Sequence, residues 1–76
     1  MKPVTLPDHL GDVPPTMRLY TVPEAMALLR FSRGTIYALM ERGRLRYVTE
    51  GRSRRIPGTA IAEYIARLEQ EAEAAA

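Results

Sequence analysis

Arginine is concentrated in the middle of this 76-residue sequence, where it stands beside hydroxyl and phenol side chains. Residues 51–55 read GRSRR, with three arginines in five positions, and residues 33–37 combine Arg33, Thr35 and Tyr37. A guanidinium group donates two parallel hydrogen bonds, and this geometry matches the oxygens of a phosphate or carboxylate. The two segments therefore predict a surface that binds a negatively charged ligand.

The charge is distributed unevenly along the chain. Its net value is only +2, yet residues 17–56 hold nine arginines against three glutamates, for a net +6. Residues 57–76 carry −3 and residues 1–16 carry −1. A basic centre of this kind favours an acidic partner such as a nucleic acid. Chance variation in a short chain is the alternative, and a GC-rich genome would also enrich arginine over lysine.

The elements that must position these side chains begin with a short helix. Thr21 and Glu24, in the run TVPE, have the pattern of a capping box, with proline in the first turn. Apolar residues then recur at helical spacing and include Leu28, which predicts a helix over residues 22–30.

A second helix follows after a very short turn. Ser32 is a suitable N-cap, and Gly43 is a suitable residue to end the helix, so we expect a helix over residues 33–42. Its inward side chains are expected to be Ile36, Leu39 and Met40. Two helices joined by a short turn form the helix-turn-helix pattern.

The next segment predicts a two-stranded wing. Strand-forming residues around Tyr47 and Val48 precede a turn at Gly51, and the chain returns through Ile56, so the tip is expected around residues 49–53. A lone hairpin is unstable in water, so its apolar residues, Val48 and Ile56 among them, must pack on the helices.

A third helix is expected from about residue 58 into the low seventies. Its apolar stripe has the i, i+3, i+4, i+7 spacing and consists of Ile61, Tyr64, Ile65 and Leu68. The fold class is therefore mainly α with a small β-hairpin, a winged helix-turn-helix of three helices plus a two-stranded wing.

This domain is expected to span residues 18–70. Residues 1–17 hold four of the six prolines and no apolar period, which predicts a flexible, proline-rich arm. Residues 71–76 (EAEAAA) lack an apolar face and are expected to fray. The absence of cysteine, of a secretory signal and of a long apolar run predicts a cytoplasmic protein without a membrane span.

The outward face of the second helix suits the major groove of double-stranded DNA. The groove admits an α-helix, and residues near the start of a recognition helix reach base edges. The small Ala38 would allow the backbone to approach the bases. This face is formed by Arg33, Thr35, Tyr37, Ala38 and Arg42.

The arginines of the wing are expected to contact phosphates or the minor groove. Alternate residues of a strand share a face, so Arg52 and Arg54 are expected on one face and Arg55 on the other, where it would contact DNA or pair with a helix carboxylate. One alternative is a hairpin kept soluble by charge. Another is an interaction module whose arginines meet an acidic protein.

Nothing in the sequence predicts an enzyme. It contains no nucleophile with a histidine partner, no paired carboxylates in a plausible cleft, no phosphate-binding loop and no metal-ligand cluster. We therefore expect no catalytic residue, no metal and no cofactor.

Residues 19–68 read LYTVPEAMALLRFSRGTIYALMERGRLRYVTEGRSRRIPGTAIAEYIARL. This segment resembles the small excisionase-type winged helix-turn-helix proteins, relatives of the MerR-type DNA-binding domain. The resemblance lies in the order and spacing of T-x-x-E, S-R-x-T-I-Y, R-G-x-L and R-R-I-P. It implies that the second helix enters the major groove and that the wing follows the backbone or the minor groove. The residues then expected to contact DNA are Thr21, Ser32, Arg33, Thr35, Tyr37, Ala38, Arg42, Arg52, Ser53, Arg54 and Arg55.

The resemblance also implies a role. Such proteins commonly act as recombination directionality factors, which bind and bend DNA at an attachment site and promote excision of a mobile element by a site-specific integrase. Cooperative self-association on tandem sites is expected, and the acidic end of the last helix would either touch a neighbour's wing or remain solvated. The alternative is a small MerR-like or AlpA-like transcription regulator.

One departure from the family lies in the turn between the first two helices. Where the family often has Gly-Val, this chain has Arg30 and Phe31. If Arg30 adopts a left-handed conformation, the expected cost is ~1 kcal/mol.

Overall fold

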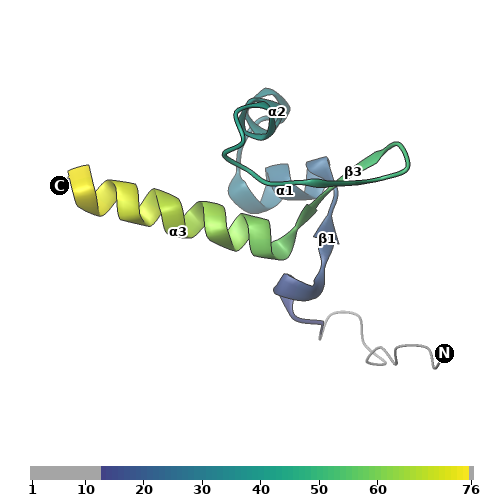
Figure 1. Cartoon of the computed structure of the whole chain (residues 1–76), viewed down its shortest axis with the longest axis horizontal. Coiled ribbons are helices and arrows are strands. Elements are labelled where there is room, and N and C mark those ends of the chain that lie inside the picture. The colour runs from purple at the N-terminus through teal and green to yellow at the C-terminus, as the bar shows by residue number, and fades with distance from the viewer. Residues whose placement is uncertain (1–12, 76) are drawn as a thin grey trace.

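The computed structural model describes residues 13–75, in which three α-helices and a small antiparallel sheet form the fold (Figure 1). In chain order the elements are the 3-10 helix η2 (Pro15–Met17), β1 (Leu19–Tyr20), α1 (Val22–Leu29), α2 (Arg33–Glu41), β2 (Val48–Glu50), β3 (Ser53–Pro57) and α3 (Gly58–Ala75). The three predicted helices and the hairpin are present, and this confirms the winged helix-turn-helix fold.

Both helices of the helix-turn-helix begin at side-chain caps. At α1 the Glu24 backbone N–H donates to the Thr21 hydroxyl at 3.2 Å, and the Thr21 N–H donates to the Glu24 carboxylate at 2.9 Å. At α2 the Thr35 N–H donates to the Ser32 hydroxyl at 3.2 Å. Each cap satisfies backbone donors that a helix start leaves without a partner, so the two starts are fixed by local sequence.

The turn between α1 and α2 is made by a left-handed arginine. Arg30 has φ 59° and ψ 41°, and its N–H donates to the Met26 carbonyl at the end of α1. The Phe31 N–H donates to the same carbonyl at 3.1 Å. A residue with a Cβ in this left-handed conformation costs roughly 1 kcal/mol of folding free energy. The turn therefore forms although its sequence has arginine where glycine would be favoured.

The sheet has three strands, although two were predicted. Its order is β1-β3-β2, and both pairs are antiparallel. In the wing, Val48 lies opposite Arg55, while on the other side of β3, Tyr20 lies opposite Ile56. Strand β1 has only two residues, which is too short to leave an alternating pattern in the sequence. Its pairing ties the segment that precedes α1 to the base of the wing.

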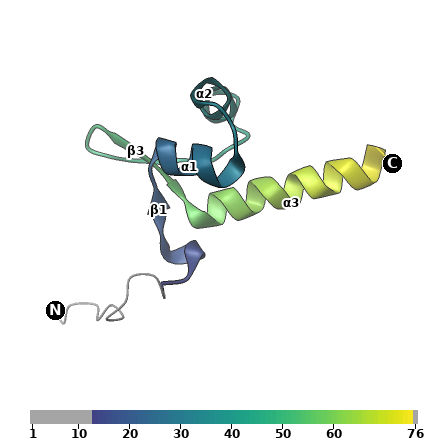
Figure 2. The ribbon, with the colours of Figure 1, turned by 180° about the vertical axis from the view of Figure 1, so that it is seen from behind.

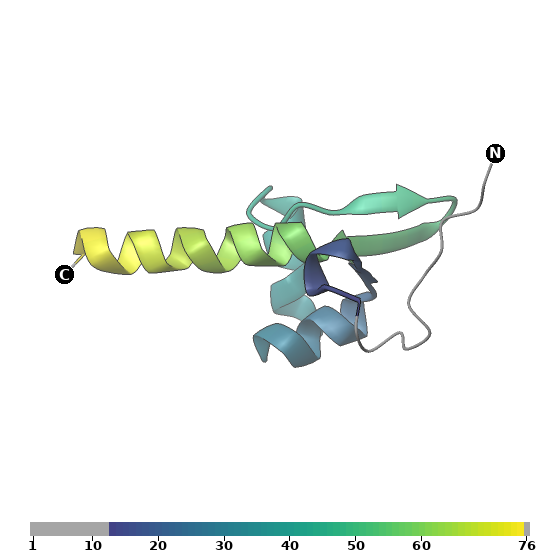
Figure 3. The same cartoon turned by 90° about the horizontal axis from the view of Figure 1, so that it is seen from below.

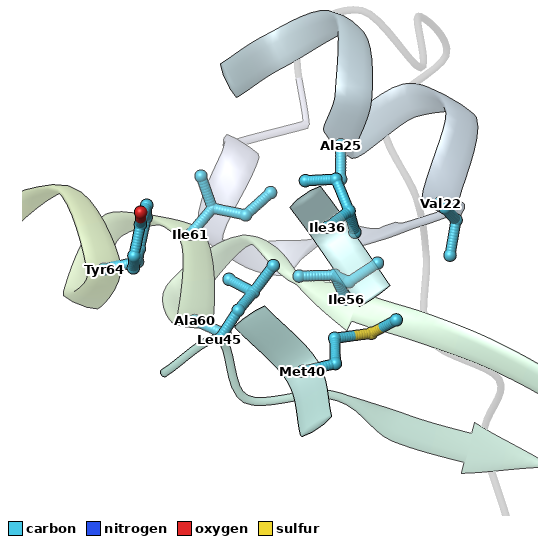
Figure 4. Close-up of a cluster of buried hydrophobic side chains, with 9 residues drawn as sticks. All are labelled: Val22, Ala25, Ile36, Met40, Leu45, Ile56, Ala60, Ile61 and Tyr64. Carbon is cyan, nitrogen blue, oxygen red and sulfur yellow. The ribbon is translucent and has the colours of Figure 1, made fainter. Parts of the chain in front are cut away.

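The core lies where the three helices meet β3 (Figure 4). Ile36, Leu45 and Ile56 are its largest fully buried side chains. The complete buried set is Val22, Ala25, Ile36, Met40, Leu45, Ile56, Ala60, Ile61 and Tyr64.

Three sequence expectations about the core were wrong. In the apolar stripe predicted for α3, Ile65 and Leu68 are 43% and 37% exposed, because that helix extends beyond the core after Tyr64.

The other two concern α1 and the wing. Leu28 was placed on the inward stripe of its helix, but it is 54% exposed, because the short α1 turns only Val22 and Ala25 fully into the core. Val48 was expected to pack on the helices, but it is 38% exposed in a strand whose three residues all face solvent at least in part.

Helix α3 extends away from the rest of the fold, and the hairpin projects in the opposite direction (Figures 1 and 2). Figure 3 shows the same arrangement from below. Helix α3 continues to Ala75, and Glu71 pairs with Arg44, while the fraying expected for residues 71–76 stays a prediction. Within residues 13–75 no helix is long and apolar enough to cross a membrane.

The predicted proline-rich arm falls mostly in residues 1–12, which lie outside the described residues. Of the part that is described, Pro15–Met17 form a 3-10 helix instead of an extended chain. This turn packs on the start of α3, where the Gly58 N–H donates to the Arg18 carbonyl at 2.9 Å. A Cβ at Gly58 would collide with the Pro15 carbonyl, so the contact requires glycine there.

Candidate nucleic-acid interface

The start of α2 presents hydroxyl groups and a cation to solvent. Ser32, Arg33 and Thr35 are all exposed, and the Ser32 and Thr35 hydroxyls lie 3.0 Å apart. The first turn of a helix also carries a partial positive charge from its unpaired N–H groups. The cationic side chain, the two hydroxyl groups and the helix dipole all favour the same kind of ligand at this end of α2, an anion that accepts hydrogen bonds.

A concave surface of about 470 Å³ lies between the starts of α1 and α2 and the wing. It is lined by Thr21, Val22, Pro23, Arg33, Tyr37, Arg52, Arg54 and Arg55. Six of these eight side chains were expected to contact DNA, and they come from the cap of α1, from α2, from the turn of the wing and from β3. None of these described lining residues is acidic, so four guanidinium groups act on one shared space. We call it the basic concavity.

Arg54 lies between two aromatic rings. Its guanidinium carbon is 5.5 Å from the ring centre of Tyr37 on α2 and 5.1 Å from that of Tyr47, which precedes β2. Its Nη1 is 3.7 Å from Glu41 Oε1, a distance suited to charge attraction and too long for a hydrogen bond. Arg54 therefore joins the wing to α2.

Arg55 lines the concavity on the α1 side, and its charge acts on Glu24 at the start of that helix. Arg55 is half-buried and donates from Nη1 to the Arg54 carbonyl at 2.9 Å. The hydrogen bonds of Glu24 with Thr21, first to the backbone N–H and then to the side chain, hold the pKa of this carboxyl below its usual 4.5, and the charges of Arg55 and Arg18 add to the effect. The capping carboxylate thus remains charged at neutral pH.

Five residues expected to contact DNA lie outside the lining of the concavity. Two of them, Ser32 and Thr35, are the exposed hydroxyl residues at the start of α2. Ala38 is half-buried on α2, and the exposed Arg42 is the C-cap of that helix, at the opposite end from Arg33. Ser53 is exposed at the first position of β3.

Two arginines of the basic centre are engaged with α3. Arg44 donates to both carboxylate oxygens of Glu71, at 2.8 and 2.9 Å. Arg46 donates to Glu63 at 3.1 Å and also to the Thr59 hydroxyl at 3.1 Å. These pairs hold the segment between α2 and β2 against α3. The charge asymmetry of the sequence therefore serves two surfaces, the basic concavity and the packing of α3.

The sequence reading did not identify Tyr47 and Glu41 as part of this site. The strand register contained a usable signal for Tyr47, because Thr49 lies opposite Arg54 and Tyr47 is on the same face as Thr49. Such diagonal neighbours across a sheet are within reach of long side chains. Glu41 lies one helical turn after Tyr37, on the same face of α2.

Among residues 13–75 there is no group of three or more His, Cys, Asp or Glu side chains placed to hold a metal ion. The fold has three helices and a wing. Helix α2 starts with exposed cationic and hydroxyl side chains, and the basic concavity lies between that start and the wing. Together these features define a helix-turn-helix DNA-binding domain.

The comparisons with known proteins agree with this class. The chain belongs to a helix-turn-helix domain family, whose model matches residues 19–69. It is 46% identical over 61 residues to a protein of Saccharopolyspora erythraea described as a probable excisionase. That match covers 80% of this chain and 62% of the relative's length. No solved structure is a significant match to this chain. Family membership makes residues 19–69 a helix-turn-helix DNA-binding domain.

Proposed function

We propose that this protein is an excisionase, a recombination directionality factor that binds and bends double-stranded DNA at an attachment site. In this role it promotes the excision of a mobile element by a site-specific integrase, in the cytoplasm of a bacterium. The basic concavity is the observation on which the proposal depends, because it joins the start of α2 and the wing in one surface of a single charge sign. The relative described as a probable excisionase supports the recombination role.

In the proposed complex α2 enters the major groove with its first turn nearest the bases. Arg33 and Thr35 read base edges there, and Tyr37 and Ala38 contact the groove further along the helix. Arg42 contacts the backbone at the far end of α2. Around the first turn of each helix, the caps Thr21 and Ser32 contribute hydroxyl donors to phosphates.

The wing lies along the backbone or in the adjacent minor groove in this arrangement. Arg52 and Ser53 are exposed near the tip and contact phosphates, and Arg55 contributes from the lining of the concavity. Each phosphate neutralised by such a contact releases bound cations, so the affinity is expected to fall steeply with salt.

A single module of this size buries a small area on DNA, on the order of 600–1,000 Å². Useful specificity then requires several copies on adjacent sites, or an integrase partner. The acidic end of α3 is the proposed contact between neighbours, with Glu69 and Glu73 as its charges, since Glu71 is held by Arg44 of the same chain. Cooperative binding to tandem sites that persists unchanged after truncation at Ala66 would rule out this contact.

The direct test is footprinting on the DNA that flanks the protein's own gene, with and without the neighbouring integrase, coupled to an excision assay. The proposal predicts protection of repeated sites beside the attachment site and a higher yield of excised product when the protein is added. If the protein protects a promoter and the excision yield is the same with and without it, the protein is a transcription regulator instead.

A further inference from the structure

We propose that Arg54 is a positioning residue that sets the angle of the wing against α2, and that it is not a phosphate contact. This assignment rests on the DNA-binding role proposed above and separates Arg54 from Arg52, its neighbour in the GRSRR run. On an alternating strand the two arginines share a face, and the sequence alone assigns both to the DNA backbone. Their surroundings in the structure are different.

The contacts of Arg54 all lie within the protein. Its guanidinium stacks between the rings of Tyr37 and Tyr47, at 5.5 and 5.1 Å, and Glu41 is 3.7 Å away. Two of these partners belong to α2 and the third precedes β2, so a single side chain from β3 links three segments. The face of an aromatic ring attracts a cation, and the flat guanidinium suits stacking between two rings.

Its Nη1 is also poorly placed for a phosphate. This atom is buried and has no hydrogen-bond partner among the described residues, and the Arg54 side chain as a whole is 36% exposed. Because Nη1 is buried, Arg54 could donate from it to a phosphate only if the side chain moved. Arg52 is exposed near the turn and has no such obstacle.

The consequence for DNA binding is geometric. The wing is a three-residue strand paired with a five-residue strand, and β2 is exposed along its whole length. Such a hairpin is weak by itself, so a contact from its middle strand pair, Thr49 and Arg54, decides how it meets the duplex when α2 is in the groove. Arg54 therefore favours one relative placement of α2 and wing. Losing it should reduce sequence preference without removing a phosphate contact.

The test compares Arg54→Gln with Arg52→Gln, which removes the same charge two residues away, and with Tyr47→Leu, which removes one ring and no charge. The probes are a duplex selected from a random pool by the wild-type protein and a random-sequence duplex of equal length, each titrated over a range of salt. Thermal unfolding establishes that each variant is folded.

We expect Arg52→Gln to weaken binding to both duplexes similarly and to reduce the salt slope by about 0.9, the loss of one phosphate contact. We expect Arg54→Gln and Tyr47→Leu to leave the slope unchanged and to reduce the preference for the selected duplex. The expected reduction is roughly tenfold for Arg54→Gln, which loses two exposed cation–π contacts, and roughly threefold for Tyr47→Leu, which loses one. If Arg54→Gln reduces the slope as Arg52→Gln does, or if Tyr47→Leu keeps the full preference, the assignment is wrong.

A measurement without DNA separates this inference from the proposed function. The assignment predicts that ¹⁵N order parameters of the wing amides, residues 48–56, fall in Arg54→Gln and Tyr47→Leu and are unchanged in Arg52→Gln. An unchanged wing in both variants would overturn the inference even if DNA binding holds. A wild-type protein that prefers no duplex would contradict the proposed function, whatever the order parameters show.

Discussion

Arg33 is exposed on the first turn of α2 and also lines the basic concavity, so its charge is available at the point where a recognition helix reaches base edges. We expect Arg33→Ala to cost about 1–3 kcal/mol of binding free energy on the preferred duplex and to relax the preference. Fluorescence anisotropy on preferred and random duplexes measures both. Arg67→Ala, which removes an equal charge from α3, serves as the control. Equal losses on every duplex from Arg33→Ala would contradict a base-reading role.

Arg30 carries strain that its neighbours do not. Its φ of 59° is in the left-handed region, and it is the non-glycine residue with positive φ within residues 13–75. Glycine adopts this conformation without steric cost but loses more chain entropy on folding. We therefore expect Arg30→Gly to raise the free energy of unfolding by about 0.5–1 kcal/mol. Thermal unfolding measures the change, and a lower melting temperature would mean that the Arg30 side chain makes a compensating contact.

Among the elements, the junction of η2 with α3 depends on close backbone contact. A Cβ at Gly58 would collide with the Pro15 carbonyl, whereas a Cβ at Gly34 in α2 meets nothing within 4 Å. We expect Gly58→Ala to destabilise the fold by about 1–3 kcal/mol through this overlap. Gly34→Ala should instead be stabilising, by about 0.5–1 kcal/mol, because alanine is the better helix former. Denaturant unfolding of the pair tests both signs, and a stable Gly58→Ala variant would show that η2 can move away.

The boundaries of the elements could be predicted wherever the signal is local. Thr21 and Ser32 each cap the helix that follows them, and Gly51 has the positive φ that the tip of the wing requires. Strand β1 was missed because its two residues gain their structure only from pairing with β3. The length of α3 was underestimated because Glu71 is held by Arg44, twenty-seven residues earlier in the chain. Periodicity contains no information about such a distant partner.

The same distinction applies to the candidate site. Helix periodicity placed Arg33 and Tyr37 on one face of α2, and the family resemblance implied that Arg52 of the wing meets the same duplex; all three line the concavity. The stacking of Arg54 between Tyr37 and Tyr47 depends on how the wing crosses α2. That crossing is set by the left-handed turn at Arg30 and by the core, neither of which is visible in a residue pattern.

Across the whole molecule, ion pairs hold the long α3 to the segment before the wing. The hydrogen bonds from Arg44, and then its charge and that of Arg67, hold the pKa of Glu71 below its usual 4.5. A depressed carboxyl pKa contributes stability that is present above the unfolded pKa and is lost as the pH falls through the folded one. We expect Glu71→Gln to make the loss of stability below about pH 4.5 shallower. Melting temperatures measured across this pH range test the change, with Glu73→Gln as the control. If the melting temperatures of wild type and Glu71→Gln fell equally with falling pH, the stabilising role of the Arg44–Glu71 pair would be contradicted.

The central claim concerns one surface of the molecule, on which the start of α2 and the wing contact the same duplex. An NMR titration of the ¹⁵N-labelled protein with its selected duplex tests it most directly. We expect the amide resonances of Thr21, Arg33, Tyr37 and Arg52 to shift together, while those at the distal end of α3 remain in place. Shifts confined to α3, or to α2 with an unaffected wing, would contradict the account.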